Sequence, residues 1–308
     1  MKLLLHACCG PCSLEPTRLL KAAGHDITIY YANSNIHPAE EYEHRLATLR
    51  AWAADAGFKV LEGPYDQATW EACAGRIGDA AIAEAEQARA EADAEGEREV
   101  EPGSPDDTAS NRCKTVTETN YGAASPDDTP LFASATGSAA PRAAVLSVDP
   151  ARREARCRAC YRLRLEETAR VAAERGFEGI GTTLSVSPYQ YTQVIREEVE
   201  RAAAQAGVAS VFEDFRPYYD EATRESRELG MYRQNFCGCR ISNLEAAAER
   251  AERKEQRAAA KAAERAAHAD ERAAEEAARA AHKAERAAYD KKQARKRAIL
   301  KSLREQGK

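Results

Sequence analysis

The alternation of short apolar runs with amphipathic segments limits the fold of this chain more than any other feature. Short apolar runs of this length are typical of buried strands, and the segments between them carry apolar residues at helical spacing. Strands joined through helices lie parallel in one sheet. The sequence therefore predicts an α/β fold, a parallel sheet with flanking helices. The first expected elements are a strand over 2–7, a helix over 13–23, a strand over 27–32, a helix over 39–56 and a strand over 59–61.

The same alternation returns in the second half, from Cys157 onward, where a helix is expected to begin. In the first half, Gly24 and Gly57 follow the two expected helices as usual helix stops. The expected elements here are a helix over 161–175, a strand over 179–184, a helix over 192–206, a strand over 208–212 and a short helix over 220–229.

The middle of the chain has a different composition. Residues 70–99 are rich in Ala and Glu and are expected to be helical at least at their start. Residues 102–150 contain Ser-Pro-Asp-Asp-Thr twice and many small residues, which favours a long, partly disordered surface insertion. A small extra lobe is the alternative. With its flanks, we expect a flexible insertion over about 73–156.

The end of the chain, from Leu244, consists almost entirely of Ala, Glu, Arg and Lys, which predicts a long charged C-terminal helix. Its 18 Lys/Arg against 12 Asp/Glu leave a net charge of −11 for the rest of the 308 residues. We expect a catalytic metal-binding domain over 1–243 and a helical tail over 244–308. A solvated helix and a partner-binding arm are both open interpretations of the tail.

Nine cysteines and the absence of a secretory signal indicate a reducing, cytoplasmic location. Disulfide scaffolding is then an unlikely use of the cysteines, so metal binding or redox chemistry is the better interpretation. No apolar stretch approaches the ~18 residues that span a bilayer, and we expect no membrane partner.

Three of these cysteines, Cys8, Cys9 and Cys12, lie between the first expected strand and the first helix. Parallel sheets bind ligands at the carboxyl ends of their strands, and a helix N-terminus stabilises thiolates. Gly10 and Pro11 suit a tight turn that brings the sulfurs together. The loop is therefore a candidate metal site.

Two further cysteine pairs are Cys157 with Cys160, expected at a helix start, and Cys237 with Cys239 around Gly238. The first pair can bind one metal ion or cluster. The second can bind metal or alternate between dithiol and disulfide. Zinc and an iron–sulfur cluster both take four thiolates, so ligand type leaves both open.

Other candidate positions follow the expected strands. The segment 182–190 suits recognition of a polar, ribose- or base-like substrate, although a plain polar loop is as good an interpretation. Asp214 is a candidate oxygen ligand or proton donor, and Asp66 is either a ligand or a helix cap. Three positions are expected to have no direct function: His6 as a core histidine, and Cys73 and Cys113 as isolated thiols. His37 is expected to line the pocket.

Five motifs occur in the order found in one family. The motifs are LLLHACCGPCS, NSNIHPAEEYEHRL, CRACYRLRLEETA, TTLSVSPYQ and FRPYYDEATRESRELGMYRQNFCGCRIS. On these motifs the chain resembles the QueH family of epoxyqueuosine reductases over about 1–70 and 157–243.

The resemblance implies a fold similar to the adenine-nucleotide alpha hydrolase (HUP) type. It implies reduction of epoxyqueuosine at the wobble position of tRNA to queuosine, the last step of queuosine biosynthesis, with electrons from a donor of unknown identity. It further implies a [4Fe-4S] cluster and a redox-active cysteine pair or a second iron. The implied residues are Cys8, Cys9, Cys157 and Cys160 for the cluster, Cys237 and Cys239 for the redox pair or second iron, Asp214 as a carboxylate beside that iron, and Cys12 as a further metal ligand.

Two rival functions are carried alongside this one. A tRNA thiolation or ligase enzyme of the ATP-pyrophosphatase type shares the fold but needs an SGGxDS-like loop, which residues 8–13 lack. A non-catalytic, zinc-stabilised RNA-binding module is favoured by the basic tail.

Overall fold

The computed structural model describes residues 1–99 and 139–306, and its contacts divide the chain into two units, Met1–Ala248 and Glu249–Lys308. The first unit is built on one sheet of five parallel strands in the order β3-β2-β1-β4-β5. The strands are β1 (Lys2–His6), β2 (Asp26–Tyr31), β3 (Lys59–Glu62), β4 (Gly179–Thr182) and β5 (Ala209–Ser210). The predicted α/β class is confirmed, and the strand order agrees with the HUP-like fold that the resemblance implies.

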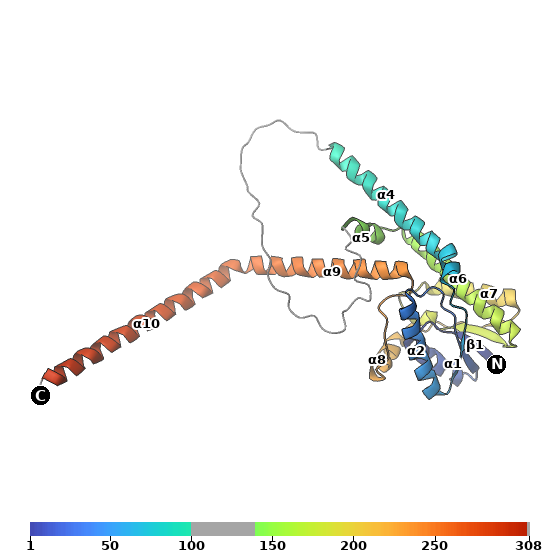
Figure 1. The fold of residues 1–308 in the computed structure, drawn as a ribbon, viewed down its shortest axis with the longest axis horizontal. Helices are drawn as coiled ribbons and strands as arrows, with labels where there is room; N and C mark the ends of the chain where they lie inside the picture. Colours follow the sequence, from blue (N-terminus) through green and yellow to red (C-terminus); the bar gives the residue numbers. More distant parts are fainter. Residues whose placement is uncertain (100–138, 307–308) are drawn as a thin grey trace. The chain divides into compact units, whose positions relative to one another are not determined.

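Helices cover both faces of this sheet (Figure 1). Left-handed glycines end α2 and α7 at Gly57 and Gly207, as expected for helix C-caps. The helices of the first unit are α1 (Leu14–Ala22), α2 (Ala39–Ala56), α3 (Gln67–Trp70), α4 (Arg76–Glu99), α5 (Ala139–Leu146), α6 (Pro150–Glu174), α7 (Thr192–Ala206), α8 (Tyr219–Glu228) and the start of α9 (Arg240–Ala267), with short turns η1 (Pro11–Ser13), η2 (Glu71–Gly75), η4 (Leu184–Val186) and η5 (Arg216–Tyr218).

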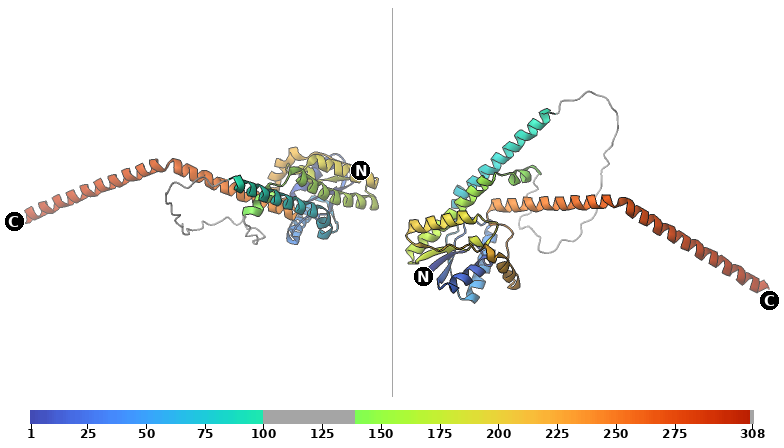
Figure 2. Two further views of the ribbon diagram at one scale, coloured as in Figure 1. Left: turned by 90° about the horizontal axis from the view of Figure 1, so that it is seen from above. Right: turned by 180° about the vertical axis from the view of Figure 1, so that it is seen from behind.

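Alternating strand residues build two cores, one on each face of the sheet. Leu3 and Leu5 of β1 join Leu46 and Leu49 of α2 on one face. Leu4 points to the other face, because successive strand side chains alternate. There it meets α6 and α7, which run side by side over the sheet (Figure 2). Burial on both faces explains the continuous apolar run of Leu3, Leu4 and Leu5 in the central strand β1.

The segment expected to be a flexible insertion over 73–156 is helical at both of its described ends. η2 and α4 continue from residue 71 to 99, and α5 packs on α4. Ala144, Val145 and Val148 are buried, which gives this side of the insertion an apolar contact surface. Residues 100–138 lie outside the described part of the chain, so the expectation for them stays a prediction.

The helix expected to start at Cys157 starts seven residues earlier, at Pro150, and that prediction is wrong. The Asp149 side chain accepts hydrogen bonds from the N–H groups of Ala151 and Arg152, at 2.7 and 3.2 Å. Asp at the N-cap followed by Pro is a strong start signal. Cys157 and Cys160 therefore lie inside α6, three residues apart on one helix face.

The last strand is shorter than predicted. β5 spans Ala209–Ser210 rather than 208–212, because it pairs with β4 only through Gly179 and Ile180 at the sheet edge. The second unit consists of the rest of α9 and of α10 (Ala269–Gln306), whose described side chains are nearly all exposed. The long charged C-terminal helix is thus present, with an interruption at His268.

Candidate metal and redox centre

The loop after β1 brings three cysteine sulfurs together at the carboxyl edge of the sheet. Among the described residues, one group of His, Cys, Asp or Glu side chains has three ligand atoms within 4.8 Å of one another, and it consists of Cys8, Cys9 and Cys12. Cys12 lies in η1, which runs into α1, so the group sits at the N-terminal end of a helix pair. We call this group the cysteine triad.

Within the cysteine triad the thiols compete for one negative charge. Hydrogen bonds from the Cys12 and Cys8 thiols, aided by the Arg45 charge, lower the pKa of Cys9 well below its usual value, against the effect of burial. The Cys12 thiol also favours a Cys8 thiolate, but contact with Cys9 and burial prevail and raise the pKa of Cys8 to about 11. Three sulfurs this close together can all ionise only when a cation binds between them, as metal ions do.

A second group contains the remaining four clustered cysteines. Burial raises the pKa of Cys157 to about 12. The Cys237 charge adds to this increase, whereas the Arg156 charge opposes it. Burial and the Cys237 charge raise the pKa of Cys239 to about 11. The interaction with Cys237 also acts on Cys160. Cys160 and Cys239 also pack in one buried cluster, and we call Cys157, Cys160, Cys237 and Cys239 the second cysteine group.

Gly238 allows the backbone between Cys237 and Cys239 to approach its neighbours closely. Its φ is +130°, a conformation that side chains disfavour. A Cβ atom there would lie 3.0 Å from Ile36 Cγ1 and 3.1 Å from Arg45 Nη1. The backbone N–H of His37 donates to the Gly238 carbonyl at 2.9 Å. The positive φ and the close neighbours explain why residue 238 is a glycine.

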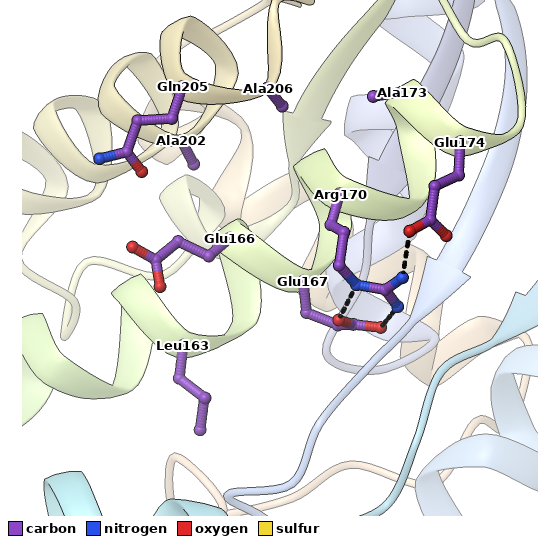
Figure 3. Close-up of a pocket in the computed structure, with 9 residues that line it drawn as sticks. All are labelled: Leu163, Glu166, Glu167, Arg170, Ala173, Glu174, Ala202, Gln205 and Ala206. Atoms are coloured by element: carbon purple, nitrogen blue, oxygen red, sulfur yellow. Dashed lines mark hydrogen bonds and ion pairs between the residues drawn. The ribbon is translucent and has the colours of Figure 1, made fainter.

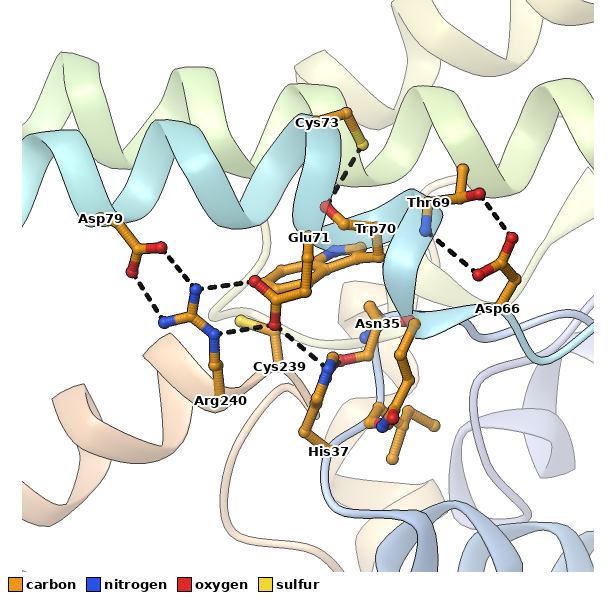
Figure 4. Close-up of polar contacts among 12 residues, drawn as sticks. Asn35, His37, Asp66, Thr69, Trp70, Glu71, Cys73, Asp79, Cys239 and Arg240 are labelled. Atoms are coloured by element: carbon orange, nitrogen blue, oxygen red, sulfur yellow. Dashed lines mark hydrogen bonds and ion pairs between the residues drawn. The ribbon is translucent and has the colours of Figure 1, made fainter.

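Ion pairs of Arg240, the residue after Cys239, hold the same loop against η2. Arg240 donates to Glu71 at 2.7–2.8 Å and to Asp79 at 2.6–2.7 Å, and His37 Nε2 lies 3.3 Å from Glu71 Oε1 (Figure 4). η2 is a π-helical turn, a feature that is frequent at functional sites. His37, expected at the pocket wall, therefore contacts the loop of the second cysteine group.

Three buried arginines supply positive charge around the sulfurs. Arg45 pairs with Glu41 at 2.7 Å and acts on Cys9. Arg156 pairs with Glu245 and lies 3.6 Å from Cys157 Sγ. Arg164 Nη1 lies 3.4 Å from Asn33 Oδ1 and interacts with thiol charges from both groups, those of Cys160, Cys237 and Cys8. Buried cations of this kind stabilise thiolates or an anionic cluster.

Unpaired polar atoms border the sulfurs and fit the presence of a bound group. A buried polar atom without a partner is costly, so a native protein usually satisfies it with a ligand or water. Arg164 Nη2 and the Asn35 amide are such atoms, and Gln234 leaves its Oε1 unpaired while its Nε2 donates to Cys9 Sγ at 3.0 Å. An all-sulfur donor set is the one that zinc and iron–sulfur clusters prefer. The residues therefore fit a metal ion or an iron–sulfur cluster.

His6 is a core histidine, as expected. It is fully buried, and its Nδ1 lies 3.1 Å from Thr182 Oγ1. Burial, and next the Arg164 charge, lower its pKa to about 3, so its imidazole is neutral at neutral pH. A neutral ring adds no charge beside the cysteine triad.

The other predicted positions lie at the same sheet edge. Asp66 is a helix cap, because it accepts from the backbone N–H and hydroxyl of Thr69. Asp214 forms a bidentate ion pair with Arg216 at the surface, which uses both of its oxygens. In the segment 182–190, Gln190 Oε1 accepts from the Tyr161 hydroxyl at 2.6 Å and lies 3.9 Å from Cys237 Sγ.

Sequence reasoning did not anticipate that one isolated cysteine packs beside the second cysteine group. Cys73, expected to have no function, packs with Trp70, Cys160 and Cys239 in one cluster. It is isolated in sequence, so no spacing signal marks it. Cys113, the other isolated cysteine, lies outside the described residues.

A surface groove of about 560 Å³ between α6 and α7 lies apart from the cysteines (Figure 3). Its charged walls are paired with one another, as Arg170 is with Glu167 and Glu174. It is lined by Leu163, Glu166, Glu167, Arg170, Ala173, Glu174, Ala202, Gln205 and Ala206. No cysteine lines it, so the candidate site remains the sheet edge.

The fold and the site together define an α/β protein of HUP-like topology with a cysteine-lined centre where such sheets bind ligands. The family model described as "Epoxyqueuosine reductase QueH" matches residues 3–89 and 138–245. The chain belongs to the QueH family of epoxyqueuosine reductases and is an oxidoreductase. The resemblance inferred from the motifs is confirmed, and all seven clustered cysteines lie within the matched residues.

Three curated relatives carry the name epoxyqueuosine reductase QueH. The chain is 25% identical to the Dehalococcoides mccartyi protein over 245 residues, 79% of this chain and 93% of that one. It is 24% identical to the Staphylococcus aureus protein over 247 residues, 77% and 74% of the two chains. It is 41% identical to the Thermotoga maritima protein over 99 residues, 32% and 52% of the two chains. Residues 90–137 and those after 245 lie outside the family match.

Proposed function

We propose that this chain reduces the epoxide of epoxyqueuosine at the wobble position of a tRNA to the alkene of queuosine, the last step of queuosine biosynthesis. One observation carries the proposal. Seven cysteines from three separate segments lie inside the region matched by the reductase family, and the buried Arg45 and Arg164 interact with four of them, Cys8, Cys9, Cys160 and Cys237, at the ligand-binding edge of the sheet. A cytoplasmic location belongs to the same proposal, and among the described helices none is long and apolar enough to cross a membrane.

The reaction sets what the site must supply. An epoxide loses both C–O bonds of its oxygen, takes up two electrons and two protons, and leaves an alkene and water. The electrons come from an external donor of unidentified chemistry. The protein must hold the epoxide beside its electron carrier and deliver protons there.

We propose a [4Fe-4S] cluster as that carrier, held by Cys8, Cys9, Cys157 and Cys160. When bound, such a cluster supplies electrons one at a time, and a Lewis-acidic iron can accept the departing oxygen. Cys12 is a competing ligand, because it completes the cysteine triad within 4.8 Å. The chain's own part is electrostatic: Arg45 and Arg164 offset the thiolate charges, and Gln234 donates to Cys9.

The second part of the proposal concerns Cys237 and Cys239. As a dithiol they would release two electrons and two protons on forming a disulfide, which balances the reduction of one epoxide. As thiolates they would instead hold a second iron, with Asp214 as the carboxylate candidate. Asp214 would then have to leave Arg216, its ion-pair partner at 2.6 Å.

The direct test is anaerobic turnover. Purified protein, a chemical reductant and tRNA bearing epoxyqueuosine are incubated, and digested nucleosides are analysed by mass. We expect wild type to convert epoxyqueuosine to queuosine with loss of one oxygen. Cys237→Ala and Cys239→Ala should each abolish conversion, whereas Cys73→Ala serves as a nearby control that keeps it.

Two other outcomes would favour the rival functions. A requirement for ATP would point to the pyrophosphatase-type chemistry. No conversion by a protein that contains zinc alone would favour the zinc-stabilised RNA-binding module. Full conversion by both cysteine variants would remove the Cys237–Cys239 pair from the mechanism.

A further inference from the structure

Tyr189 is the most exposed large aromatic side chain among the described residues, and it lies at the edge of the sheet that carries the cysteines. Its exposed fraction is 81%, in the loop between β4 and α7. β4 lies next to β1, whose own loop carries the cysteine triad. The connections from these two strands cover opposite faces, α1 on one and α7 on the other, which makes this the topological switch point where α/β sheets bind ligands.

The ring of Tyr189 packs against one neighbouring aromatic ring, and its backbone is fixed by a hydrogen bond. Its backbone N–H donates to Ser187 Oγ at 3.3 Å. The ring of Tyr219, the first residue of α8, packs edge-to-face against it with centroids 6.3 Å apart and planes at 84°. Such a pair contributes to ordering both rings while leaving most of Tyr189 open to solvent.

The neighbour of Tyr189 connects the ring to the redox thiols. Gln190 Oε1 lies 3.9 Å from Cys237 Sγ, and the same oxygen accepts from the buried Tyr161 hydroxyl at 2.6 Å. Adjacent Cα atoms are ~3.8 Å apart, so the backbone of Tyr189 lies within about 4 Å of that of Gln190, whose side chain contacts Cys237. A flat group stacked on Tyr189 would lie next to Gln190, the residue that contacts Cys237.

We propose that Tyr189, supported by Tyr219, is a stacking site for an unpaired nucleobase of the RNA substrate. The proposal rests on the proposed function, because it requires an RNA whose modified nucleoside enters the cysteine site. Proteins bind single-stranded RNA loops by stacking splayed bases on exposed aromatic rings, and any base can stack because each has a π-face. A docked protein would instead cover the approach to Cys237, so a nucleobase is the better occupant.

The test uses an RNA hairpin with a seven-nucleotide loop that contains 2-aminopurine, whose fluorescence falls when it stacks. Binding is measured by anisotropy for wild type, Tyr189→Ala and Tyr189→Phe. Leu229→Ala is the matched control, since Leu229 is also exposed, at 54%, but lies at the other end of α8. The 81% exposure of Tyr189 means that its truncation removes little buried surface, and a thermal melt checks the fold of each variant.

We expect Tyr189→Ala to bind about tenfold more weakly and to lose the quenching, as the removal of one stacking partner does. Tyr189→Phe should keep both, because stacking needs the ring and not the hydroxyl, and Leu229→Ala should match wild type. Wild-type affinity and quenching in Tyr189→Ala would overturn the stacking site while the reductase proposal stands. A wild-type protein without affinity for any hairpin would overturn both. Tyr189→Ala could instead bind RNA normally and lose turnover only with a protein electron donor. That result would assign Tyr189 to protein docking and overturn the nucleobase site.

Discussion

Arg45 Nη1 donates a hydrogen bond to the carbonyl oxygen of Cys237, 2.9 Å away, across 192 residues of sequence. The same guanidinium lowers the pKa of Cys9 in the cysteine triad and pairs with Glu41. One buried side chain of α2 therefore links both cysteine groups. The guanidinium of Arg45 pairs with Glu41 and at the same time donates to loop carbonyls through separate N–H groups, which the single ammonium of lysine cannot reproduce.

Replacing Arg45 should be costly for stability and for the loop. Arg45→Met leaves the Glu41 carboxylate buried without its cation, which costs about 3–5 kcal/mol. Urea unfolding measures this loss. Arg50→Met on the same helix is the control, because its pair with Glu62 is exposed and should cost no more than ~1 kcal/mol. Equal stabilities of the two variants would contradict the role assigned to Arg45.

Gly238 should not tolerate even one added carbon. Gly238→Ala places a Cβ atom 3.0–3.1 Å from Ile36 and Arg45 at a φ of +130°. We expect a loss of about 2 kcal/mol or more and of epoxide reduction, because the loop must shift. Gly207→Ala is the matched control: φ is +72° but nothing lies within 4 Å, so only ~1 kcal/mol of backbone strain is expected. Both variants are compared by thermal unfolding and turnover.

Acid should weaken the α6–α7 contact through Glu198. Burial disfavours its carboxylate, but hydrogen bonds from Arg162 and Arg201 outweigh burial and lower its pKa. The stability that this ionised carboxylate contributes is then fully present above the unfolded-state pKa of about 4.3 and is lost as the pH falls through the lower folded value. Unfolding of Glu198→Gln from pH 6 to about pH 3 should show a flatter acid limb than wild type.

The exposed neighbour Glu200 provides the control for this pH dependence. Glu200→Gln should keep the wild-type acid limb. An acid limb that Glu198→Gln leaves unchanged would show that other carboxylates set the acid stability.

The net positive charge of the tail is concentrated in its last 18 residues. Residues 249–290 have ten basic and ten acidic residues, whereas residues 291–308 have eight basic and one acidic. A cut after Asn243 would also remove Glu245, the partner of buried Arg156, so the informative cut is after Asp290. We expect this truncation to weaken RNA binding modestly and to reduce its salt dependence, because phosphate contacts release counterions.

The control for the tail keeps its length. Replacing Lys291, Lys292, Arg295, Lys296 and Arg297 by Gln should reproduce the effect of truncation, while turnover at saturating tRNA survives. Unchanged affinity and salt slope in both variants would favour a solvated helix.

The fold could be predicted from the sequence where burial leaves a pattern. Leu3, Leu4 and Leu5 of β1 form a continuous apolar run because both faces of this strand are covered. The start of α6 was missed although Asp149 and Pro150 are capping residues, because they follow an insertion whose composition suggests a loop. β5 was overestimated because an edge strand can be apolar beyond its last paired residue.

The candidate site could be predicted as a set of cysteines but not as two groups. The sequence marks Cys12 only by its proximity to Cys8 and Cys9, and nothing in it shows that Cys157 interacts with Cys237. Arg45 and Arg164 could not be identified either. A buried arginine on a helix has the same sequence pattern as a solvated one, and only the fold shows which charges face the sulfurs.

The metal and sulfide content of anaerobically purified protein, with its visible spectrum, tests the central claim most directly. The account predicts a brown wild-type protein with iron and acid-labile sulfide, loss of most of both in Cys157→Ser, and their retention in Cys73→Ser. A colourless wild-type protein that contains zinc and no sulfide would contradict it, as would a fully loaded Cys157→Ser variant.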